Sequence, residues 1–468
     1  MEPAYRSSYG RTAWREGITP GLLTDMYHPD SAYISWVVGR NGLTTFDLYA
    51  RIAPFGGAYL LVAGLEQALE FVRDFHYTRE DLRYLAQVRD YDPGFLDELG
   101  LLRFTGEILA MPEGSIAFPN EPLLRVTAPY REALLLESGL LNAINLATLI
   151  ATKASRVVYA AQGRRVAEFS FRRAQEPFVV ARSSFIGGCA STSFVAAAYQ
   201  YRLLATGTIP HALVQLFDDE RSAFEAVART FNRYTLLLDT YDVRQAIRTA
   251  VEIARQSQHL LGHTLAAVRL DGGDLIADSR YVREVLDGAN LPEVKILASG
   301  DLDEFSIAAL VESGAPIDSF GVGTSLGVGA GSLEHDVAGG SLGGIYKLVQ
   351  YVDEGGAVHQ RAKRAGVKST WPGKKEVFRV GDFEQDIIDV VGEPEPERAT
   401  RLLKPVVQQG NVLPGSLPPL SEIWELAQQN LRRLPERYRA LHCDQPYPVR
   451  FSPALQRMRA ELFGEAPS

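Results

Sequence analysis

Between residues 166 and 322 the chain alternates short apolar runs with amphipathic segments, and this rhythm limits its possible folds more than any other feature. Strands are expected at 166–171, 234–239, 266–270, 294–298 and 319–322, with helices at 183–201, 243–261, 276–287 and 301–313. Strands that alternate with helices form a parallel sheet with crossover helices. Because no interruption divides the run into two halves, we expect an irregular α/β (TIM-like) barrel and not an open sheet.

The segments on either side of this barrel have a different pattern. Strand-rich stretches at 44–53, 104–111, 115–118 and 123–127 and a helical stretch at 59–75 predict an α/β sandwich-like domain over residues 1–130. Further strand candidates at 347–353 and 375–380 do not fit the barrel rhythm. We therefore expect the segment of about 346–410 to complete the N-terminal domain, the barrel to cover 131–345, and a helical tail to cover 411–468.

Charge and cysteine content exclude several classes of protein. Lys and Arg total 48 against 57 Asp and Glu, a net charge of −9, which disfavours a nucleic-acid partner. The two cysteines, Cys189 and Cys443, lie far apart and offer neither a disulfide framework nor a cysteine-rich zinc site, as suits a cytoplasmic protein.

The longest uncharged apolar stretch, 138–152, is shorter than the roughly 18–20 residues of a membrane span, and no secretory leader is evident, so no membrane partner is expected.

Polar or glycine residues follow each expected barrel strand, where the active sites of such barrels lie. One polar βα loop is ordinary turn chemistry, but six polar or glycine-containing segments in succession, five after expected strands and one ending at His211, indicate a site. The candidates are Arg172, His211, Asp239 with Asp242, Arg269 with Asp271 and Asp274, Gly300 with Asp301, and Gly323 with Thr324.

Two of these loops indicate a phosphate site. Gly300 and Gly323 each precede a residue that could begin a helix, and backbone N–H groups at such a position bind phosphate well. Together with Arg269 they favour a monophosphate. Asp271 and Asp274 offer oxygen acceptors for a ribose diol or for Mg²⁺.

The other candidates have alternative, purely structural readings. Asp239 and Asp242 offer the same acceptors as Asp271, but the DTYD segment could equally supply a helix N-cap. Phe169 and Arg172 could sandwich a flat anionic ring, or be a core phenylalanine and a surface arginine.

Taken in order, the motifs resemble the nicotinate phosphoribosyltransferase family over residues 18 to 380. They are Thr24-Asp25-Met26-Tyr27, EFSFRRAQ from Glu168, IGG from Ile186, STSFV from Ser191, GTIPH ending at His211, LLLDTYDV, VRLDGGDL, ASGDLDE, FGVGTSLGV and the basic segment KSTWPGKK from Lys368. Each motif alone is loose, whereas the ordered set is specific.

The resemblance implies a type II phosphoribosyltransferase that acts in NAD biosynthesis. Such an enzyme joins nicotinate to 5-phosphoribosyl-1-pyrophosphate (PRPP) to give nicotinate mononucleotide and pyrophosphate, with Mg²⁺ as cofactor and ATP hydrolysed as a co-substrate in a ligase-type reaction. It also implies a cytoplasmic homodimer with active sites shared between subunits.

The resemblance further implies roles for particular residues. Tyr27, contributed by the neighbouring subunit, and Phe169 would stack on the pyridine ring, and Arg172 would meet the substrate carboxylate or the pyrophosphate. Ser193 stands where nicotinamide-using relatives carry an aspartate, and a neutral hydroxyl suits a carboxylate substrate because an aspartate would repel it. His211 matches the histidine that is transiently phosphorylated.

The resemblance also assigns the ribose-phosphate site. Arg269 and Asp271 would hold the phosphate and the diol of the ribose. The 5-phosphate would be bound by Gly300, Asp301, Gly323 and Thr324.

The chain departs from the family pattern at Ser170, where glycine is usual, at Phe194, and at Pro210 and Ala212 on either side of His211. The last two changes bear on the ATP-coupled step. Three alternatives stay open: a nicotinamide-using enzyme, a quinolinate-using enzyme on the same fold, and a ligand-binding relative without turnover.

Overall fold

A computed structural model describes residues 19–443 and 445–464 of the chain. It divides into two compact units, one made of Met1–Leu149 with Ser341–Ser468 and the other of Ile150–Gly340. The first unit is therefore assembled from both ends of the chain, with boundaries at 149 and 341 where the sequence suggested 130 and 345. Helix α6 (Glu137–Ala160) runs across the first boundary. Among the described residues, no helix combines the length and the apolar character that crossing a bilayer requires.

The second unit contains a six-stranded, fully parallel sheet. Its strand order is β7 (Ser191–Thr192), β6 (Arg165–Glu168), β11 (Ser319–Val322), β10 (Lys295–Ala298), β9 (Thr264–Leu270) and β8 (Arg233–Leu237). The expected irregular α/β (TIM-like) class is confirmed. In the part of the chain that the structure describes, the sheet forms a half barrel with β7 and β8 as its two edges.

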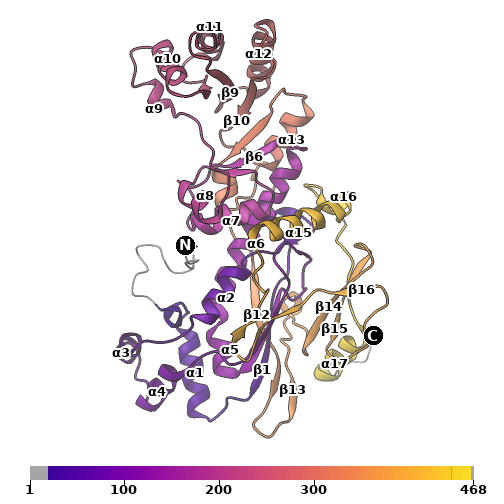
Figure 1. The fold of residues 1–468 in the computed structure, drawn as a ribbon. Helices are drawn as coiled ribbons and strands as arrows, with labels where there is room; N and C mark the ends of the chain where they lie inside the picture. The colour runs from indigo at the N-terminus through magenta and orange to yellow at the C-terminus, as the bar shows by residue number, and fades with distance from the viewer. Residues whose placement is uncertain (1–18, 444, 465–468) are drawn as a thin grey trace. The chain divides into compact units, whose positions relative to one another are not determined.

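Helices connect these strands (Figure 1), and short-range sequence signals fix their ends. They are α7 (Pro177–Ile186), α8 (Val195–Tyr201), α9 (His211–Val214), α10 (Glu220–Thr230), α11 (Val243–Leu261), α12 (Leu275–Gly288), α13 (Glu304–Glu312) and α14 (Thr324–Gly327). At the start of α11 the Asp242 carboxylate accepts a 2.7 Å hydrogen bond from the backbone N–H of Gln245. At its end, Gly262 adopts the left-handed conformation that stops the helix.

One expected element of the second unit is wrong. The helix expected over 183–201 is instead α7, the short strand β7 and α8. Gly187 and Gly188 stop α7, since Gly188 adopts a φ of +106° that a helix does not allow. The chain then turns so that Ser191 and Thr192 pair with β6, which creates an additional strand end beside the candidate site.

The first unit has a seven-stranded antiparallel sheet and two smaller sheets. The large sheet has the order β13 (Val358–Gln360), β12 (Gly344–Val352), β1 (Leu43–Ala50), β5 (Leu124–Pro129), β3 (Glu107–Ala110), β17 (Lys404–Gln408) and β18 (Asn411–Val412). The four-stranded sheet has β16 (Ala399–Arg401), β14 (Lys375–Val380), β15 (Gln385–Val390) and β19 (Val449–Phe451), and a two-stranded sheet pairs β2 (Leu60–Leu61) with β4 (Ile116–Ala117).

The helices of the first unit come from both ends of the chain. They are α1 (Tyr27–Val37), α2 (Leu65–Arg73), α3 (Arg79–Val88), α4 (Pro93–Leu101), α5 (Tyr130–Leu135), α15 (Leu420–Arg433), α16 (Glu436–Arg439) and α17 (Pro453–Phe463). The expected helical tail thus also contributes strands β18 and β19, and β19 pairs in parallel with β15.

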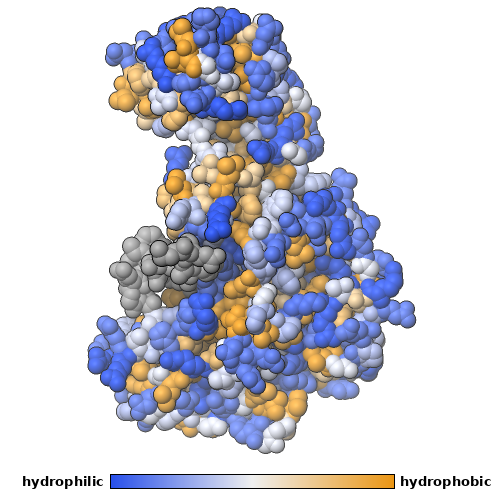
Figure 2. Space-filling model, in the orientation of Figure 1, coloured by the Kyte–Doolittle hydropathy of each residue, from blue (hydrophilic) through white to orange (hydrophobic). Residues whose placement is uncertain are grey.

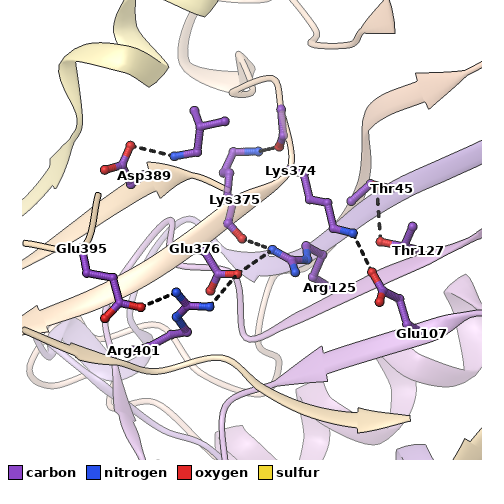
Figure 3. Close-up of polar contacts among 12 residues, drawn as sticks. Thr45, Glu107, Arg125, Thr127, Lys374, Lys375, Glu376, Asp389, Glu395 and Arg401 are labelled. Carbon is purple, nitrogen blue, oxygen red and sulfur yellow. Dashed lines mark hydrogen bonds and ion pairs between the residues drawn. The ribbon is translucent and has the colours of Figure 1, made fainter. Parts of the chain in front are cut away.

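The basic segment that begins at Lys368 is used to build the first unit (Figure 3). Lys374 donates to Glu107 over 2.5 Å, and Lys375, which is buried, donates to Asp47 over 2.8 Å. Farther along β14, Arg379 forms an ion pair of 2.6 Å with Asp386. Lys374 and Lys375 therefore tie the start of β14 to β3 and β1 of the seven-stranded sheet, and Arg379 ties β14 to β15.

Candidate active site

Arg269, near the end of β9, is the centre of a polar network at the strand ends of the second unit. Its guanidinium donates three hydrogen bonds: Nε to Ser299 Oγ at 2.8 Å, Nη1 to Thr208 Oγ1 at 2.7 Å, and Nη2 to Asp271 Oδ1 at 2.6 Å. Ser299 follows β10 and Asp271 follows β9, whereas Thr208 lies in the loop between α8 and α9. The planar cation is thus oriented before any ligand binds.

Asp271 is held from several directions. Its Oδ1 accepts a 2.6 Å hydrogen bond from Ser299 Oγ in addition to the one from Arg269, and its backbone N–H donates to Asp239 Oδ2 over 2.7 Å. Burial acts to raise the pKa of the Asp271 carboxyl, but the Ser299 hydrogen bond and the charge of Arg269 outweigh it, so the pKa lies below its usual value. Asp271 is accordingly a fixed, ionised acceptor at neutral pH.

His211 begins α9 and lies against the same carboxylate. Its Nε2 atom is 3.5 Å from Asp271 Oδ2, and its Nδ1 atom is 3.1 Å from Thr240 Oγ1. Pro210 occupies the N-cap position just before the helix in an extended conformation. The imidazole is two-fifths exposed, so solvent or a ligand can reach it.

Phe169 follows β6, and its ring lies near the guanidinium of Arg269. The guanidinium carbon of Arg269 is 5.9 Å from the centre of the Phe169 ring. The ring also passes so close to β11 that a Cβ atom at Gly321 would lie 2.5 Å from its Cε2 atom. The four predicted residues Phe169, Arg269, Asp271 and His211 are therefore brought into one contiguous cluster.

Ser193 lies in the loop after β7, next to the Phe169 loop. Its backbone N–H donates to the Glu168 carbonyl over 2.9 Å. The Phe194 ring stacks on Phe171 with a centroid distance of 4.2 Å. Figure 2 shows apolar residues gathered on this face around α8, and Val195 and Tyr199 are exposed there.

The loops that contain Gly300 and Gly323 bring their main chain close to the cluster. Gly300 has a φ of +95°, and a Cβ atom there would lie 2.0 Å from the Asp271 carbonyl oxygen. Asp301 follows with a φ of +47° and is exposed. Gly323 and the exposed Thr324 mark the junction of β11 with the four-residue helix α14.

Two predicted residues are not brought into this cluster. Arg172 is exposed on the turn 171–173. Tyr27 belongs to the first unit, where its side chain is 55% exposed, and burial of the remainder, with the charge of Glu137, raises the pKa of its hydroxyl.

The aspartates considered as alternatives have mixed roles. Asp242 caps α11, as the structural interpretation of the DTYD segment proposed, and Asp274, which was expected to bind a ribose diol or Mg²⁺, caps α12. Asp239 instead supports Asp271, and its Oδ1 atom is buried without a hydrogen-bond partner among the described residues. The described ranges hold no group of three or more His, Cys, Asp or Glu side chains arranged to bind a metal.

Sequence reasoning missed two hydroxyl partners, Thr208 and Thr240. Both lie inside motifs that were noted, GTIPH and LLLDTYDV, one before His211 and one after β8. For Thr240 the available signal was its position directly beside Asp239 at a strand end, whereas Thr208, between Gly207 and Ile209, carried no such signal.

Comparison with known proteins gives a consistent result along the chain. Residues 22–145 match the family described as nicotinate phosphoribosyltransferase N-terminal domain, and residues 389–459 match the corresponding C-terminal domain. The chain is 40% identical over 450 residues to nicotinate phosphoribosyltransferase pncB2 of Mycobacterium tuberculosis, covering 94% of this chain and 93% of that protein. It is 35% identical over 465 residues to nicotinate phosphoribosyltransferase of Bacillus subtilis, covering 92% of each.

A solved structure agrees with these sequence matches. The crystal structure of human nicotinic acid phosphoribosyltransferase superposes with a TM-score of 0.82 at 30% identity, covering 94% of this chain and all of that one.

Proposed function

The chain belongs to the nicotinate phosphoribosyltransferase family, and from this premise we propose that it converts nicotinate and PRPP into nicotinate mononucleotide and pyrophosphate in NAD biosynthesis. The observation that carries the proposal is the single cluster of Phe169, Arg269, Asp271 and His211 at adjoining strand ends. It combines an aromatic face, a fixed cation and a fixed carboxylate. Those are the three chemistries that a pyridine, a phosphate and a ribose diol require.

The ribose phosphate is assigned to the strand ends of β9, β10 and β11. The Asp271 carboxylate, whose pKa is lowered, accepts hydrogen bonds from the ribose hydroxyls, and Arg269 pairs with phosphate oxygens. Gly300, Asp301, Gly323 and Thr324 supply backbone N–H groups and a hydroxyl for the 5-phosphate.

The pyridine ring is assigned to the β6 and β7 strand ends. Phe169 stacks on the ring, and Ser193 faces its carboxylate with a neutral hydroxyl. Exposed Arg172 meets the carboxylate or the pyrophosphate, and Tyr27 is supplied by a second copy of the chain in a cytoplasmic homodimer. The exposed apolar residues around α8 favour such an interface.

The transfer needs positioning and charge stabilisation more than proton transfer. As the bond from C1 of the ribose to pyrophosphate breaks, positive charge develops on the sugar, and the pyridine nitrogen adds to C1 from the opposite face. That nitrogen already carries a free lone pair, so no general base is required. The fixed Arg269 and Asp271 side chains lower the cost of reorganisation during this step.

Mg²⁺ fits the site as a cation that arrives with the substrate. Magnesium usually keeps several waters and binds through one or two carboxylates together with substrate phosphates. Asp271 and Asp301 could provide those carboxylates, in keeping with the absence of a larger acidic cluster from the described residues. When bound, the ion neutralises the leaving pyrophosphate.

ATP coupling is assigned to His211. The imidazole is accessible, and its two nitrogens lie beside Thr240 and Asp271, so a phosphorylated His211 would place its charge next to the ribose carboxylate. We propose that repulsion between these groups links ATP hydrolysis to the occupancy of the PRPP site.

Product formation separates the proposal from its alternatives. The purified protein is incubated with PRPP, Mg²⁺ and either nicotinate or nicotinamide, with and without ATP, and the mononucleotides are quantified by chromatography. Nicotinate mononucleotide formed faster with ATP supports the proposal. Product from nicotinamide alone would support the nicotinamide-using alternative, and binding without product from either base would indicate a relative without turnover.

A further inference from the structure

Glu168, the last residue of β6, lies at the junction of the two loops assigned to the pyridine ring. Its side chain is 2% exposed. The Oε1 atom accepts hydrogen bonds from the backbone N–H and the hydroxyl of Ser170, both at 2.5 Å, and the Oε2 atom accepts one from Thr192 Oγ1 at 2.5 Å. One buried carboxylate therefore accepts hydrogen bonds from Ser170, in the loop after β6, and from Thr192, the last residue of β7.

The donors are the immediate neighbours of the residues that would contact the ring. Ser170 directly follows Phe169, and Thr192 directly precedes Ser193. The main chain of Glu168 adds a further link, since its carbonyl accepts the Ser193 N–H at 2.9 Å. Any movement of the Glu168 side chain would thus shift both the aromatic face and the hydroxyl that faces the substrate carboxylate.

Ser170 also extends the connection to the third loop. A Cβ atom at Gly327, the last residue of α14, would lie 2.3 Å from Ser170 Cβ. The backbone N–H of Phe169 donates to the carbonyl of Val322, at the end of β11, over 2.8 Å. The loop after β6 is therefore packed directly on the segment that begins at Gly323.

We propose that Glu168 is the positioning residue for the acceptor ring, setting the separation between Phe169 and Ser193. This inference rests on the proposed function and deepens it. A carboxylate is suited to the task because it is an acceptor only, with room for several donors, and hydrogen bonds to a charged group are stronger than neutral ones. Glu168 does not contact the reacting atoms itself.

The first test is the variant Glu168→Gln. An amide keeps the size of the side chain, but it has one accepting oxygen and one donating nitrogen, so it cannot serve all three donors. We expect the KM for nicotinate to rise about tenfold, as for the loss of about one hydrogen bond to a charged group, with kcat and the KM for PRPP within about threefold of wild type. Glu225→Gln, a surface glutamate on α10 paired with Arg229, is the matched control and should change nothing.

A second variant tests the same link from the other side. Thr192→Val retains the shape of the side chain but removes the hydroxyl, which donates to Glu168 and also accepts the Phe194 backbone N–H over 3.0 Å, and it should raise the KM for nicotinate about threefold. In the double variant with Glu168→Gln the effects should be less than multiplicative, because both changes break one shared hydrogen bond. The proposal would be overturned if the effects of the two changes were fully multiplicative. It would also be overturned if either variant raised the KM for nicotinate and the KM for PRPP by the same factor.

Hydrogen–deuterium exchange separates this inference from the proposed function. If the wild type makes no nicotinate mononucleotide, the proposed function fails, yet Glu168→Gln should still accelerate amide exchange about tenfold in 169–173 and 192–195. Unchanged exchange there would overturn the positioning role whatever the activity. Faster exchange throughout Ile150–Gly340 would also overturn it, since it would indicate a general structural role.

Discussion

The Nε2 atom of His211 lies 3.5 Å from Oδ2 of Asp271, while the other carboxylate oxygen of Asp271 is bound by Arg269 and Ser299. The side chain assigned to ATP, His211, is therefore in direct contact with the side chain assigned to the ribose, Asp271. A change of charge on His211 will be felt directly at Asp271, because only a short, partly buried gap separates them.

His211→Asn should uncouple ATP from the transfer reaction. Asparagine can still form hydrogen bonds near Thr240 and Asp271, but it cannot take up a phosphoryl group. We expect the rate without ATP to change by less than about threefold and the stimulation by ATP to disappear. Steady-state rates of nicotinate mononucleotide formation, measured with and without ATP, report this directly.

The control for this prediction is His259→Asn, an exposed histidine on α11 outside the cluster. It should keep the wild-type response to ATP. If His211→Asn lowered both rates by the same factor, the histidine would act in substrate binding and not in a separate ATP-dependent step.

Gly300→Ala should weaken PRPP binding and destabilise the protein. The left-handed φ of +95° costs a side chain of the order of 1–3 kcal/mol, and the added Cβ would collide with the Asp271 carbonyl oxygen at 2.0 Å. To relieve that contact the β9 or β10 loop must shift, so the KM for PRPP should rise by about tenfold or more. Thermal unfolding and PRPP titration measure the two effects.

Gly314→Ala provides a matched comparison for Gly300. Gly314 also has a positive φ, of +70°, but a Cβ there meets nothing within 4 Å. It should lose some stability and keep the KM for PRPP. Similar KM values for the two variants would show that the close approach at Asp271 is unimportant for the PRPP site.

Ser193→Asp should lower the use of nicotinate selectively. A carboxylate facing the carboxylate of the substrate adds like-charge repulsion, which in a partly buried site costs several kcal/mol, so kcat/KM for nicotinate should fall by about 100-fold. The neutral variant Ser193→Asn should lose much less. An equal loss in both variants would point to side-chain size instead of charge, and competition assays with nicotinamide would show whether specificity has moved.

The sequence predicts elements well where local signals decide them. The helix expected at 243–261 coincides with α11 because Asp242 and Gly262 cap it, and the strand expected at 319–322 coincides with β11. The break at Gly187 and Gly188 was missed, because apolar residues on both sides of the pair continue a helical pattern. Pairing of β1 with β12, about 300 residues apart, depends on tertiary packing that periodicity does not report.

The candidate site was predictable in part for a related reason. Arg269 and Asp271 lie at the end of β9 and Phe169 follows β6, and parallel strands bring their ends to one edge of the sheet, so the proximity of these residues follows from topology. His211 begins α9, and its place beside Asp271 depends on the loop that leads into that helix. The choice of Thr208 and Thr240 as partners depends on loop conformation, which the sequence pattern does not determine. Gly300 was expected to bind phosphate through its backbone N–H group. The structure adds a second reason for glycine at this position, because a side chain would collide with the Asp271 carbonyl oxygen.

Glu220 should make the stability of the second unit depend on pH between about 4.5 and 7. Burial raises the pKa of its carboxyl from 4.5 to about 7, and the nearby charge of Asp242 adds to the effect. The folded state therefore holds this proton more tightly than the unfolded chain does. The protonated Glu220 therefore contributes its full stabilisation below the pKa of the unfolded chain, 4.5. That contribution to the free energy of unfolding is lost as the pH rises through the folded-state pKa of about 7.

Glu220→Gln tests this pH dependence, because glutamine stays neutral at every pH. Since the side chain is partly exposed, the variant should gain only about 1 kcal/mol over wild type at pH 8, and the difference should vanish near pH 4.5. Denaturant unfolding followed by circular dichroism at several pH values measures this difference. Glu225→Gln, on the same helix and paired with Arg229, is the control and should not reproduce the pH dependence of Glu220→Gln. A constant difference for Glu220→Gln would mean that Glu220 ionises normally, and that the Glu220 and Asp242 carboxylates do not interact in the folded protein.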